Sequence, residues 1–506
     1  MNESVGKVVL VGAGPGDPGL LTLRGAEALQ SADVIFYDYL ASPQLLKVAP
    51  PSVKLVCLGR HGQGRIYSQE DINERIVAEA KQGKFVVRLK GGDPAIFGHL
   101  AEELDVLEAA HIPYEIVPGI SAACAASSYA EIPITHRDTA SCVTFVTGQE
   151  QADKQQKTEL DYAVLATTPG TLVFYMGVTT AASWSKSLIE NGKSPETPVA
   201  VIRRCSLPDQ TTMTGTLGDV AERLWSEELR PPAIVIVGEV ARHAPTQNWF
   251  TARPLFGQTI LVTRPADQAG EMATPLAAMG AGVVCQPAIE IAPPDDWSGV
   301  DQAIQQLSTF DWIVFSSRNG VRYFLDRVGE LGQDPRALAS VRIAAIGPAT
   351  VAQLAKYSLR ADLCPEIHRA EALAEALAAD ASGQQMLLVR ASRGREVLAE
   401  ILTSGGVGVR QVVTYTSRDV RVPDPEVANM LAQGEIDWVT VTSSAIAHAI
   451  VNLFGSQLKQ TKLAAISPLT ADVLRSAGYE PAAVAEVYTG AGLVKAITSG
   501  QFDPPK

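Results

Sequence analysis

A glycine-rich turn follows the first apolar run of the chain, in the stretch KVVLVGAGPGDPGLLTLRGAEAL at residues 7–29. Gly12 and Gly14 match the first two glycines of a dinucleotide-binding turn, where a strand and a helix hold a pyrophosphate against backbone N–H groups. Asp38 stands about where such a site carries its ribose-binding carboxylate. NAD binding is therefore the first hypothesis.

Other residues of the same turn oppose a phosphate ligand. Asp17 replaces the third glycine and puts a negative charge where the pyrophosphate would lie. Pro15 and Pro18 each lack the backbone N–H that a phosphate cradle uses. The residues favour a ligand without phosphate, with a rigid surface turn as the structural alternative.

Further predicted strands end in glycine-rich turns, in the stretches VVRLKGGDPAIFG (86–98), EIVPGISAACAAS (115–127) and TLVFYMGV (171–178). Glycine at a strand end lets a ligand approach the backbone closely. Asp93 can accept hydrogen bonds from an ammonium group or a ribose hydroxyl, and Met176 can line an apolar wall. Small residues such as Ser121 and Ala122 leave room for a bulky group.

The second half of the sequence contains hydroxyl residues and arginines that could bind a ligand. Hydroxyl residues end several predicted strands: Ser316, Ser317, Thr350, Thr442, Ser443, Ser444 and Thr470. Helix capping is the alternative role for these residues. Arginines that could face a polyanion are Arg264, Arg318, Arg390, Arg393 and Arg395, although a single arginine is more often a solvated surface group.

These residues need a scaffold, and the apolar pattern predicts an α/β fold. Near-continuous Val/Ile runs closed by Gly, Ser or Thr alternate with helical patterns, which favours buried parallel strands. In the second half FDWIVFSS returns as IDWVTVTSS, and AAIGPATVAQL returns as AAISPLTADVL. The repeat predicts a duplicated α/β unit with a ligand between two lobes. A linker is expected around residues 251–256.

Composition narrows the class of protein. The 506 residues are 46% hydrophobic and 19% charged, which indicates several well-packed domains. The net charge of -13 argues against non-specific nucleic-acid binding. No secretory signal or membrane span is expected, so the predicted location is the cytoplasm. The six cysteines form no CxxC pair and the seven histidines no HxxxH, so no metal site is predicted.

The motifs VVLVGAGPGDPGLLTLRGAEAL, VVRLKGGDPAIFG, IPYEIVPGISAA, IPITHRD and LVFYMG make residues 5–250 resemble the tetrapyrrole methylases, especially the uroporphyrinogen-III C-methyltransferases. The resemblance implies two α/β domains with the active site between them, usually in a homodimer. It also implies S-adenosyl-L-methionine as cofactor, S-adenosyl-L-homocysteine as its product, and a tetrapyrrole substrate in place of NAD. The implied reaction transfers two methyl groups to uroporphyrinogen III and gives precorrin-2, on the branch toward sirohaem and cobalamin.

The same resemblance assigns site residues. The cofactor contacts would be Pro15, Gly91, Gly92, Asp93, Ile96, Ser121, Ala122, Met176, Ala200 and Gly215. Asp38 matches the proton acceptor of the family, and Arg88 would bind substrate. Arg60 stands where the family has its proposed proton-donating lysine, and an arginine is a poor proton donor near neutral pH.

The chain also departs from the methylase pattern at positions expected to face substrate: Arg60, Arg65, His99, Leu100, Ala101 and Cys205. Altered tetrapyrrole specificity, or tetrapyrrole binding without chemistry, is therefore kept as the alternative for the first half.

The motifs ILVTRPADQA, DWIVFSSRNGV, IAAIGPAT, VVTYTS and GLVKAI make residues 257–500 similar to uroporphyrinogen-III synthase. The implied reaction removes the hydroxyl of hydroxymethylbilane, inverts the last pyrrole ring and closes the macrocycle. Tyr415 would assist loss of the hydroxyl, while Thr350, Ser443 and Thr470 would bind substrate. The implied lobes are residues 257–293 with 417–506, and residues 294–416.

The two implied reactions are consecutive, because the synthase product is the methylase substrate. We therefore predict a bifunctional enzyme with a methylase domain at 1–250 and a synthase domain at 257–506. Small-molecule tetrapyrroles are its expected partners, and a homodimer would form through the methylase domain. The rival hypotheses are a dehydrogenase that uses the first turn and a protein that binds tetrapyrroles without turnover.

Overall fold

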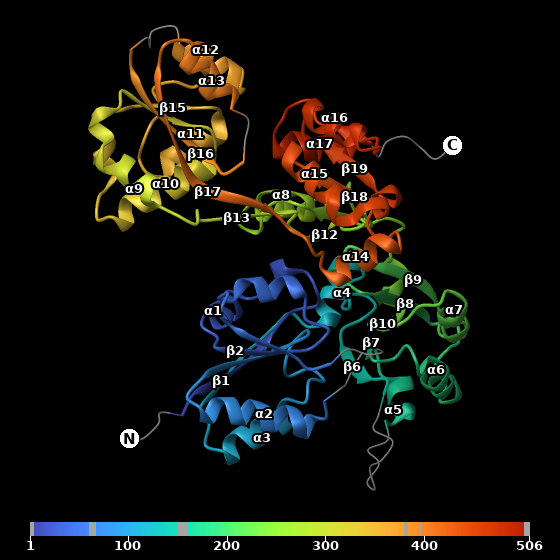
Figure 1. The fold of residues 1–506 in the computed structure, drawn as a ribbon. Coiled ribbons are helices and arrows are strands. Elements are labelled where there is room, and N and C mark those ends of the chain that lie inside the picture. Colours follow the sequence, from blue (N-terminus) through green and yellow to red (C-terminus); the bar gives the residue numbers. More distant parts are fainter. Residues whose placement is uncertain (1–4, 60–66, 150–159, 379–382, 394–395, 500–506) are drawn as a thin grey trace. The chain divides into compact units, whose positions relative to one another are not determined.

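The computed structural model describes residues 5–59, 67–149, 160–378, 383–393 and 396–499. The chain divides into two compact units (Figure 1). The first unit comprises residues 1–258 and 277–282, and the second comprises residues 259–276 and 283–506. None of the described helices is both long and apolar enough to cross a bilayer.

The first unit begins with a parallel sheet in the strand order β3-β2-β4-β1-β5. Its strands are β1 (Lys7–Gly12), β2 (Val34–Tyr37), β3 (Lys54–Cys57), β4 (Phe85–Lys90) and β5 (Tyr114–Val117). Its helices are α1 (Leu23–Gln30), α2 (Gln69–Lys81) and α3 (Leu100–Ala109). Leu29 of α1 packs against one face, whereas Ile76 of α2 and Leu107 of α3 cover the other (Figure 1). The carboxyl ends of β1 and β4 thus meet at one edge of the sheet.

The second sheet of this unit has the order β6-β7-β10-β8-β9. Its strands are β6 (Val143–Thr147), β7 (Thr171–Tyr175), β8 (Pro198–Arg203), β9 (Thr211–Thr216) and β10 (Ala233–Val237). The helices around it are α4 (Ala122–Ala130), α5 (Tyr162–Thr167), α6 (Ala181–Glu190) and α7 (Val220–Ser226). Trp184 of α6 stacks on Phe174 of β7 with ring centroids 4.4 Å apart, which anchors that helix on the sheet.

The α/β fold class is confirmed, but the prediction of parallel strands is wrong for part of this sheet. β10 pairs antiparallel with both β7 and β8, and β8 pairs antiparallel with β9. Val201 and Val235 pack into one core, while Ala200 and Ile236 pack into another on the opposite face. A strand buried on both faces is apolar throughout whichever way it runs, so its composition does not reveal its direction.

The second unit contains two more sheets. One has the order β12-β11-β18-β19-β20, with β11 (Thr259–Val262), β12 (Gly282–Cys285), β18 (Trp438–Val441), β19 (Lys462–Ala465) and β20 (Ala483–Val484). The other has the order β13-β17-β16-β14-β15, with β13 (Ile289–Ala292), β14 (Trp312–Phe315), β15 (Arg342–Ala345), β16 (Gln385–Ala391) and β17 (Gly408–Asp419). Within the second sheet β13 pairs antiparallel with β17. β13 is the first strand of this sheet along the chain, and β17 is the last.

Helices surround both sheets. The helices that adjoin the strands of the first sheet along the chain are α8 (Ala266–Ala278), α14 (Pro425–Ala432), α15 (Ser444–Phe454), α16 (Pro468–Ser476) and α17 (Gly490–Ser499). The helices that adjoin the strands of the second sheet are α9 (Ser298–Gln305), α10 (Arg318–Glu330), α11 (Pro348–Lys356), α12 (Ala370–Ala378) and α13 (Val397–Ser404). The repeated sequences take equivalent places, because β14 leads into α10 as β18 leads into α15. Ser317 and Ser443 cap these helices by accepting from Gly320 N and Ile446 N.

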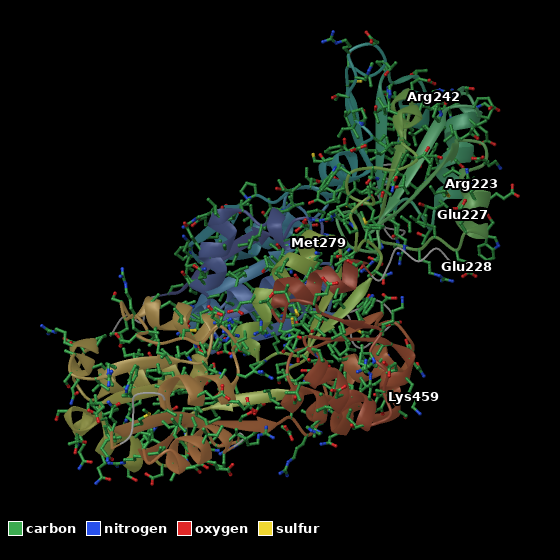
Figure 2. The ribbon with its side chains drawn as sticks, turned by 90° about the horizontal axis from the view of Figure 1, so that it is seen from above. Arg223, Glu227, Glu228, Arg242, Met279 and Lys459 are labelled. Carbon is green, nitrogen blue, oxygen red and sulfur yellow. The ribbon has the colours of Figure 1, made fainter. Side chains whose placement is uncertain are left out.

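The stretch expected as a linker is folded onto the first unit. Phe250 and Leu255 are almost fully buried, and Leu255 N donates to the carbonyl of Met279 at 2.8 Å. Exposed pairs such as Arg223 with Glu227 on α7 lie on the outside of this unit (Figure 2). Such surface pairs contribute little to stability.

Candidate active sites

Three glycine turns of the first unit meet so closely that side chains would not fit. Gly92 N donates to Gly14 O at 2.7 Å, which joins the first turn to the turn after β4. A Cβ atom on Gly12 would lie 2.4 Å from Gly119 N, and one on Gly119 would lie 2.2 Å from Gly92 O. A Cβ atom on Gly92 would instead meet only Ala122 N, at 3.7 Å. The glycines therefore build the edge of the sheet, and Gly92 keeps it open beside the start of α4.

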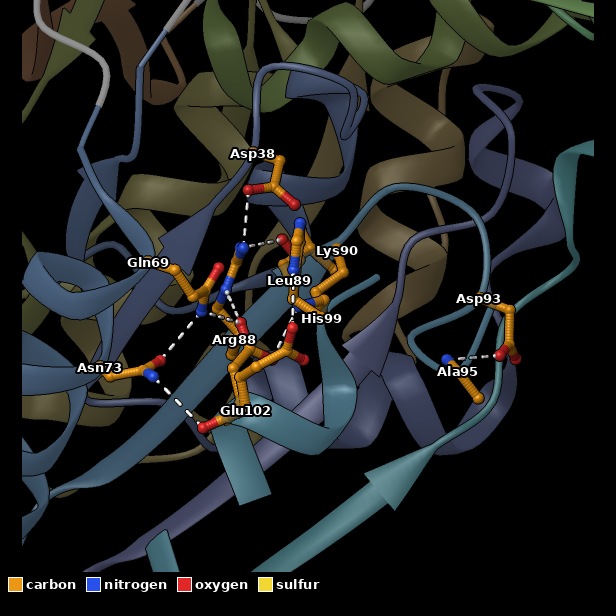
Figure 3. Close-up of polar contacts among 11 residues, drawn as sticks. Asp38, Gln69, Asn73, Arg88, Leu89, Lys90, Asp93, Ala95, His99 and Glu102 are labelled. Carbon is orange, nitrogen blue, oxygen red and sulfur yellow. Dashed lines mark hydrogen bonds and ion pairs between the residues drawn. The ribbon is translucent and has the colours of Figure 1, made fainter. Parts of the chain in front are cut away.

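Asp93 ties two of these turns together. Its Oδ1 accepts from Ala95 N at 2.8 Å (Figure 3), and its Oδ2 accepts from Gly119 N at 3.0 Å. Both carboxylate oxygens thus hold backbone groups of the glycine turns. Ile96, which follows in the same loop, is half-buried, as is Pro15 in the first turn.

The remaining residues assigned to the cofactor lie around Tyr175, at the end of β7. The Tyr175 hydroxyl lies 2.5 Å from Ser121 Oγ and accepts from Ala123 N at 3.1 Å, next to Ala122. Met176 follows and is 48% exposed. Ala200 is fully buried in β8, and Gly215 is paired with Val199 on the neighbouring strand β9. The motif LVFYMG contains Tyr175, but no role was predicted for this residue from the sequence.

The loops near this tyrosine hold strained backbone. Phe97 and His99 both have φ 53, and Met176 has φ 54, which is the left-handed region that residues with a side chain rarely adopt. The Phe97 ring is tilted against Tyr175 with centroids 5.0 Å apart, and it is 42% exposed. Strained residues of this kind cluster at functional sites. Phe97 and Met176 give the edge two exposed apolar walls.

A cluster of charged groups is buried behind the same edge (Figure 3). Arg88 of β4 donates from Nη2 to Asp38 Oδ1 at 2.8 Å and from Nε to Glu103 Oε1 at 3.2 Å. Lys90 Nζ donates to Glu103 Oε2 at 2.7 Å. Burial, together with the neighbouring Arg88, lowers the pKa of Lys90 below its ordinary value. Asp38 is the member of this cluster that reaches partly into solvent, with its side chain 27% exposed.

Several departures from the methylase pattern have visible surroundings. His99, Leu100 and Ala101 open α3, where His99 Nδ1 lies 3.2 Å from Glu102 Oε1. Cys205 is buried, and this burial raises the pKa of its thiol to about 12. Arg60 and Arg65 lie outside the described residues.

The second unit has a pocket of about 320 Å³. It is lined by Arg264, Pro265, Gln268, Ile289, Ile291, Asn319, Ala391, Arg393, Tyr415, Ser417, Thr442, Ser443, Ala445 and Ile446. The Tyr415 hydroxyl lies 2.9 Å from Ser317 Oγ, and its ring stacks on Tyr323 with centroids 5.8 Å apart. Burial raises the pKa of Tyr415, so the phenol keeps its proton at neutral pH.

The structure brings together only part of the predicted binding hydroxyls. Ser443 lies in the pocket beside Thr442. Thr350 and Thr470 are 3% and 2% exposed and are not among the lining residues. The Thr470 hydroxyl lies 3.1 Å from Ser467 Oγ, within the first turn of α16.

Likewise, only some of the arginines predicted to face a polyanion line the pocket. Arg264 and Arg393 line the pocket, where Arg264 Nη1 lies 3.2 Å from Glu271 and Arg393 Nη1 lies 2.9 Å from Asp419. Arg318 pairs with Glu271, and Arg390 pairs with Glu396. Arg395 lies outside the described residues. Within the described ranges, no cluster of three or more His, Cys, Asp or Glu residues could hold a metal ion.

The first unit is thus an α/β fold in which glycine turns meet at one edge of a sheet, and the second is an α/β fold of two sheets with a polar pocket. The family described as Tetrapyrrole (Corrin/Porphyrin) Methylases matches residues 7–221, and the family described as Uroporphyrinogen-III synthase HemD matches residues 270–495. The "Porphyrin biosynthesis protein HemD" of Ruminiclostridium josui is 34% identical over 447 residues, which cover 88% of each chain. The chain belongs to the family of proteins that join a tetrapyrrole methylase domain to a uroporphyrinogen-III synthase domain.

Other relatives match less of the chain. The "Uroporphyrinogen-III C-methyltransferase" of Bacillus subtilis is 38% identical over 340 residues, which cover 67% of each chain. The "Siroheme synthase" of Zymomonas mobilis is 46% identical over 252 residues, and the match spans about half of that protein, 52%. A solved "Uroporphyrin-III C-methyl transferase from Thermus thermophilus complexed with S-adenyl homocysteine" is 38% identical, with a TM-score of 0.41, and the match covers 47% of this chain and 99% of that one.

Both resemblances drawn from the sequence are therefore confirmed at the level of the family. The chain combines methyltransferase and synthase domains of porphyrin and sirohaem biosynthesis. This family membership replaces the dinucleotide hypothesis that the first glycine turn raised.

Proposed function

We propose that the chain catalyses two consecutive steps of tetrapyrrole biosynthesis. The second unit converts hydroxymethylbilane to uroporphyrinogen III, and the first unit methylates uroporphyrinogen III twice to give precorrin-2. The observation that carries the proposal is the presence of both family domains in one chain, because the product of one reaction is the substrate of the other.

The edge of the first unit suits S-adenosyl-L-methionine. Gly91, Gly92 and Asp93 would hold its polar groups where Gly92 leaves the edge open, and Phe97 and Met176 offer apolar walls. Small side chains at Ser121 and Ala122 leave room beside them. Bound there, the cofactor supplies a methyl group on a positively charged sulfur.

The residues of the first unit then align and deprotonate the substrate. A pyrrole carbon is already nucleophilic, so the protein mainly places it in line with the methyl group. The carbon–carbon bond forms as the methyl–sulfur bond breaks, and S-adenosyl-L-homocysteine leaves. Asp38 takes the proton that the macrocycle loses afterwards, as a general base at the mouth of the site.

In the second unit, Tyr415 donates a hydrogen bond to the hydroxyl that leaves hydroxymethylbilane. Its raised pKa supports this role, since the phenol stays protonated. Arg264 and Arg393 bind the carboxylates of the substrate, and Ser443 adds a hydroxyl on the same wall. The carbon–oxygen bond breaks as the hydroxyl takes up a proton and departs as water. The last ring is inverted, and the macrocycle closes with release of one proton, which balances the proton taken up.

We also propose that the enzyme works in the cytoplasm as a homodimer formed through the methylase domain. The support is the resemblance of the first half to the methylases. Light scattering coupled to size exclusion would test it, and a monomeric mass at micromolar concentration would contradict it.

The full chain should be incubated with hydroxymethylbilane and S-adenosyl-L-methionine, followed by mass analysis of the tetrapyrroles. We expect a product with two added methyl groups, and uroporphyrinogen III alone when the cofactor is left out. If supplied uroporphyrinogen III gains no methyl group, the first unit has another tetrapyrrole substrate or only binds one. If hydroxymethylbilane yields only the type I isomer, the synthase half of the proposal is wrong.

A further inference from the structure

The strand β4 carries two cations in the interior of the first unit. Arg88 and Lys90 are 3% and 4% exposed, and Glu103 of α3, which lies between them, is 3% exposed. Ions lose most of their hydration at such positions, so a buried ion cluster is weak evidence for added stability. A function in the neighbouring candidate site would explain why these charged groups are buried.

The Arg88 side chain is held on all sides. Its Nη2 donates to Asp38, its Nε donates to Glu103, and its Nη1 donates to the carbonyl of Leu89 at 3.1 Å. Glu103 is fixed in turn by Lys90 and by Gln69 of α2, whose Nε2 donates to Oε1 at 3.2 Å (Figure 3). A guanidinium engaged through three nitrogens and nearly without solvent contact is poorly placed to bind a substrate carboxylate directly.

The Asp38 carboxylate is held on one side only. Oδ1 accepts from Arg88, whereas Oδ2 accepts from no side chain among the residues that the structure describes. The backbone N–H of Asp38 donates to Leu89 O at 3.3 Å, so the residue is also attached to β4 through its main chain. One oxygen is thus anchored while the other is available to a substrate.

We propose that Arg88 is a positioning residue that orients Asp38, and that Glu103, Lys90 and Gln69 fix Arg88 for this purpose. The inference rests on the proposed function, because it concerns the proton acceptor of the methylation site. The sequence suggested that Arg88 binds substrate, whereas its contacts favour a role in holding Asp38. Among the described residues, Arg88, Lys90 and Tyr39 interact electrostatically with Asp38.

The first test compares kcat and KM for methylation in the parent chain and in Arg88→Gln. Loss of the guanidinium leaves Asp38 Oδ1 without its anchor, so we expect kcat to fall about tenfold or more while KM stays within about twofold of the parent. Lys84→Gln is the matched control, because Lys84 precedes the same strand about 13 Å away and pairs with Glu79. Parental kcat in a folded Arg88→Gln protein, or a raised KM with unchanged kcat, would overturn the proposal.

Arg88→Lys separates charge from orientation. A lysine keeps the positive charge but cannot reach Asp38, Glu103 and the Leu89 carbonyl at once. We expect kcat to fall about tenfold or more in this variant as well, since misplaced bases lose rate steeply. Parental kcat in this variant would overturn the orienting role, and the variant carries the test if Arg88→Gln does not fold.

A readout without turnover separates this inference from the proposed function. The ¹³C signal of the Asp38 carboxyl group, assigned by its loss in Asp38→Asn, should shift in Arg88→Gln and stay in place in Lys84→Gln, because only the first variant removes the hydrogen bond to Oδ1. This result would stand even if the parent transferred no methyl group to uroporphyrinogen III. An unchanged signal beside an active parent would sink the inference and leave the function intact.

Discussion

The two candidate sites use charge in opposite ways. In the first unit Arg88, Lys90 and Glu103 are buried behind the glycine turns, and only Asp38 reaches toward solvent. In the second unit the charges lie in the pocket wall itself, where the Arg264 and Arg393 side chains are 18% and 42% exposed. Their partners Glu271 and Asp419 are also partly exposed, so incoming carboxylates can replace them.

This difference teaches where each unit tolerates change. A buried cluster has no solvent to compensate a lost partner, so a substitution there disturbs the geometry of the groups that the lost side chain held. An exposed arginine pair is screened by water, and its loss weakens binding without disturbing the reacting groups. We therefore expect loss of a charge in the cluster of the first unit to lower kcat, and loss of a pocket arginine in the second unit to raise KM.

The largest expected effect is that of Asp38→Asn on methylation. Removal of a general base should lower kcat by about 10²-fold to 10⁴-fold, while the affinity for S-adenosyl-L-methionine stays near that of the parent. Methyl transfer from labelled cofactor and calorimetric titration measure the two quantities. The synthase activity of the same preparation is the internal control. Retention of more than a third of parental kcat would remove Asp38 from the mechanism.

Tyr415→Phe should have the next largest effect. Without the phenol, formation of the type III isomer should slow by about 10²-fold, the lower end of general-acid catalysis. Hydroxymethylbilane also closes without enzyme and then keeps its last ring unflipped, so the ratio of type III to type I isomer is the measurement. Tyr323→Phe is the matched control on the neighbouring ring, and we expect it to keep the ratio. A parental isomer ratio in Tyr415→Phe would show that the ring only packs.

The first unit shows which parts of a site can be predicted from the sequence. Asp93 and the glycine turns lie in contiguous motifs, so their joint position at one edge of the sheet could be predicted from strand ends. The contacts of Arg88 could not, because Asp38, Gln69 and Glu103 come from separate elements and meet only through the fold. Tyr175 was missed for the same reason, since its partners are on α4.

The second unit was harder to predict residue by residue. Its pocket gathers positions from Arg264 to Ile446, and no local pattern distinguishes Ser443, which lines the pocket, from Thr470, which is buried in α16. Hydroxyls after a strand suit both ligand binding and helix capping, and Ser317 and Ser443 cap their helices. Strand direction in the second sheet of the first unit escaped prediction because both faces of β8 and β10 are buried.

Asp93→Ala should have an intermediate effect and would sharpen the contrast between the units. Its two oxygens hold Ala95 N and Gly119 N, so the variant loses two charge-assisted hydrogen bonds that shape the turns. A loss of about 1.5 kcal/mol or more corresponds to about tenfold weaker cofactor binding in calorimetry. Asp93→Asn, which retains acceptor capacity, should fall between the parent and Asp93→Ala. Unchanged affinity in Asp93→Ala would show that the cofactor does not use these turns.

Arg393→Gln should raise the KM for hydroxymethylbilane by about fivefold, because an exposed ionic contact contributes up to about 1 kcal/mol. The value of kcat should stay within about twofold of the parent. Arg336→Gln is a suitable control, since Arg336 is 89% exposed, pairs with Asp334 and does not line the pocket. A fall in kcat with unchanged KM would contradict the view that these arginines only bind.

The smallest effect distinguishes two hydroxyls that the sequence could not separate. Ser443 lines the pocket, so Ser443→Ala should raise KM by about twofold to threefold, and loss of its cap on α15 should cost about 1 kcal/mol of stability. Thr470 is buried beside Ser467, so Thr470→Val should lower stability by a similar amount through its lost hydrogen bond and leave KM unchanged. Thermal unfolding and steady-state kinetics on both variants give the comparison. Because the stability losses are matched, only contact with substrate can separate the two KM values. A higher KM in Thr470→Val than in Ser443→Ala would mean that the substrate reaches α16 and that the pocket is larger than its described lining.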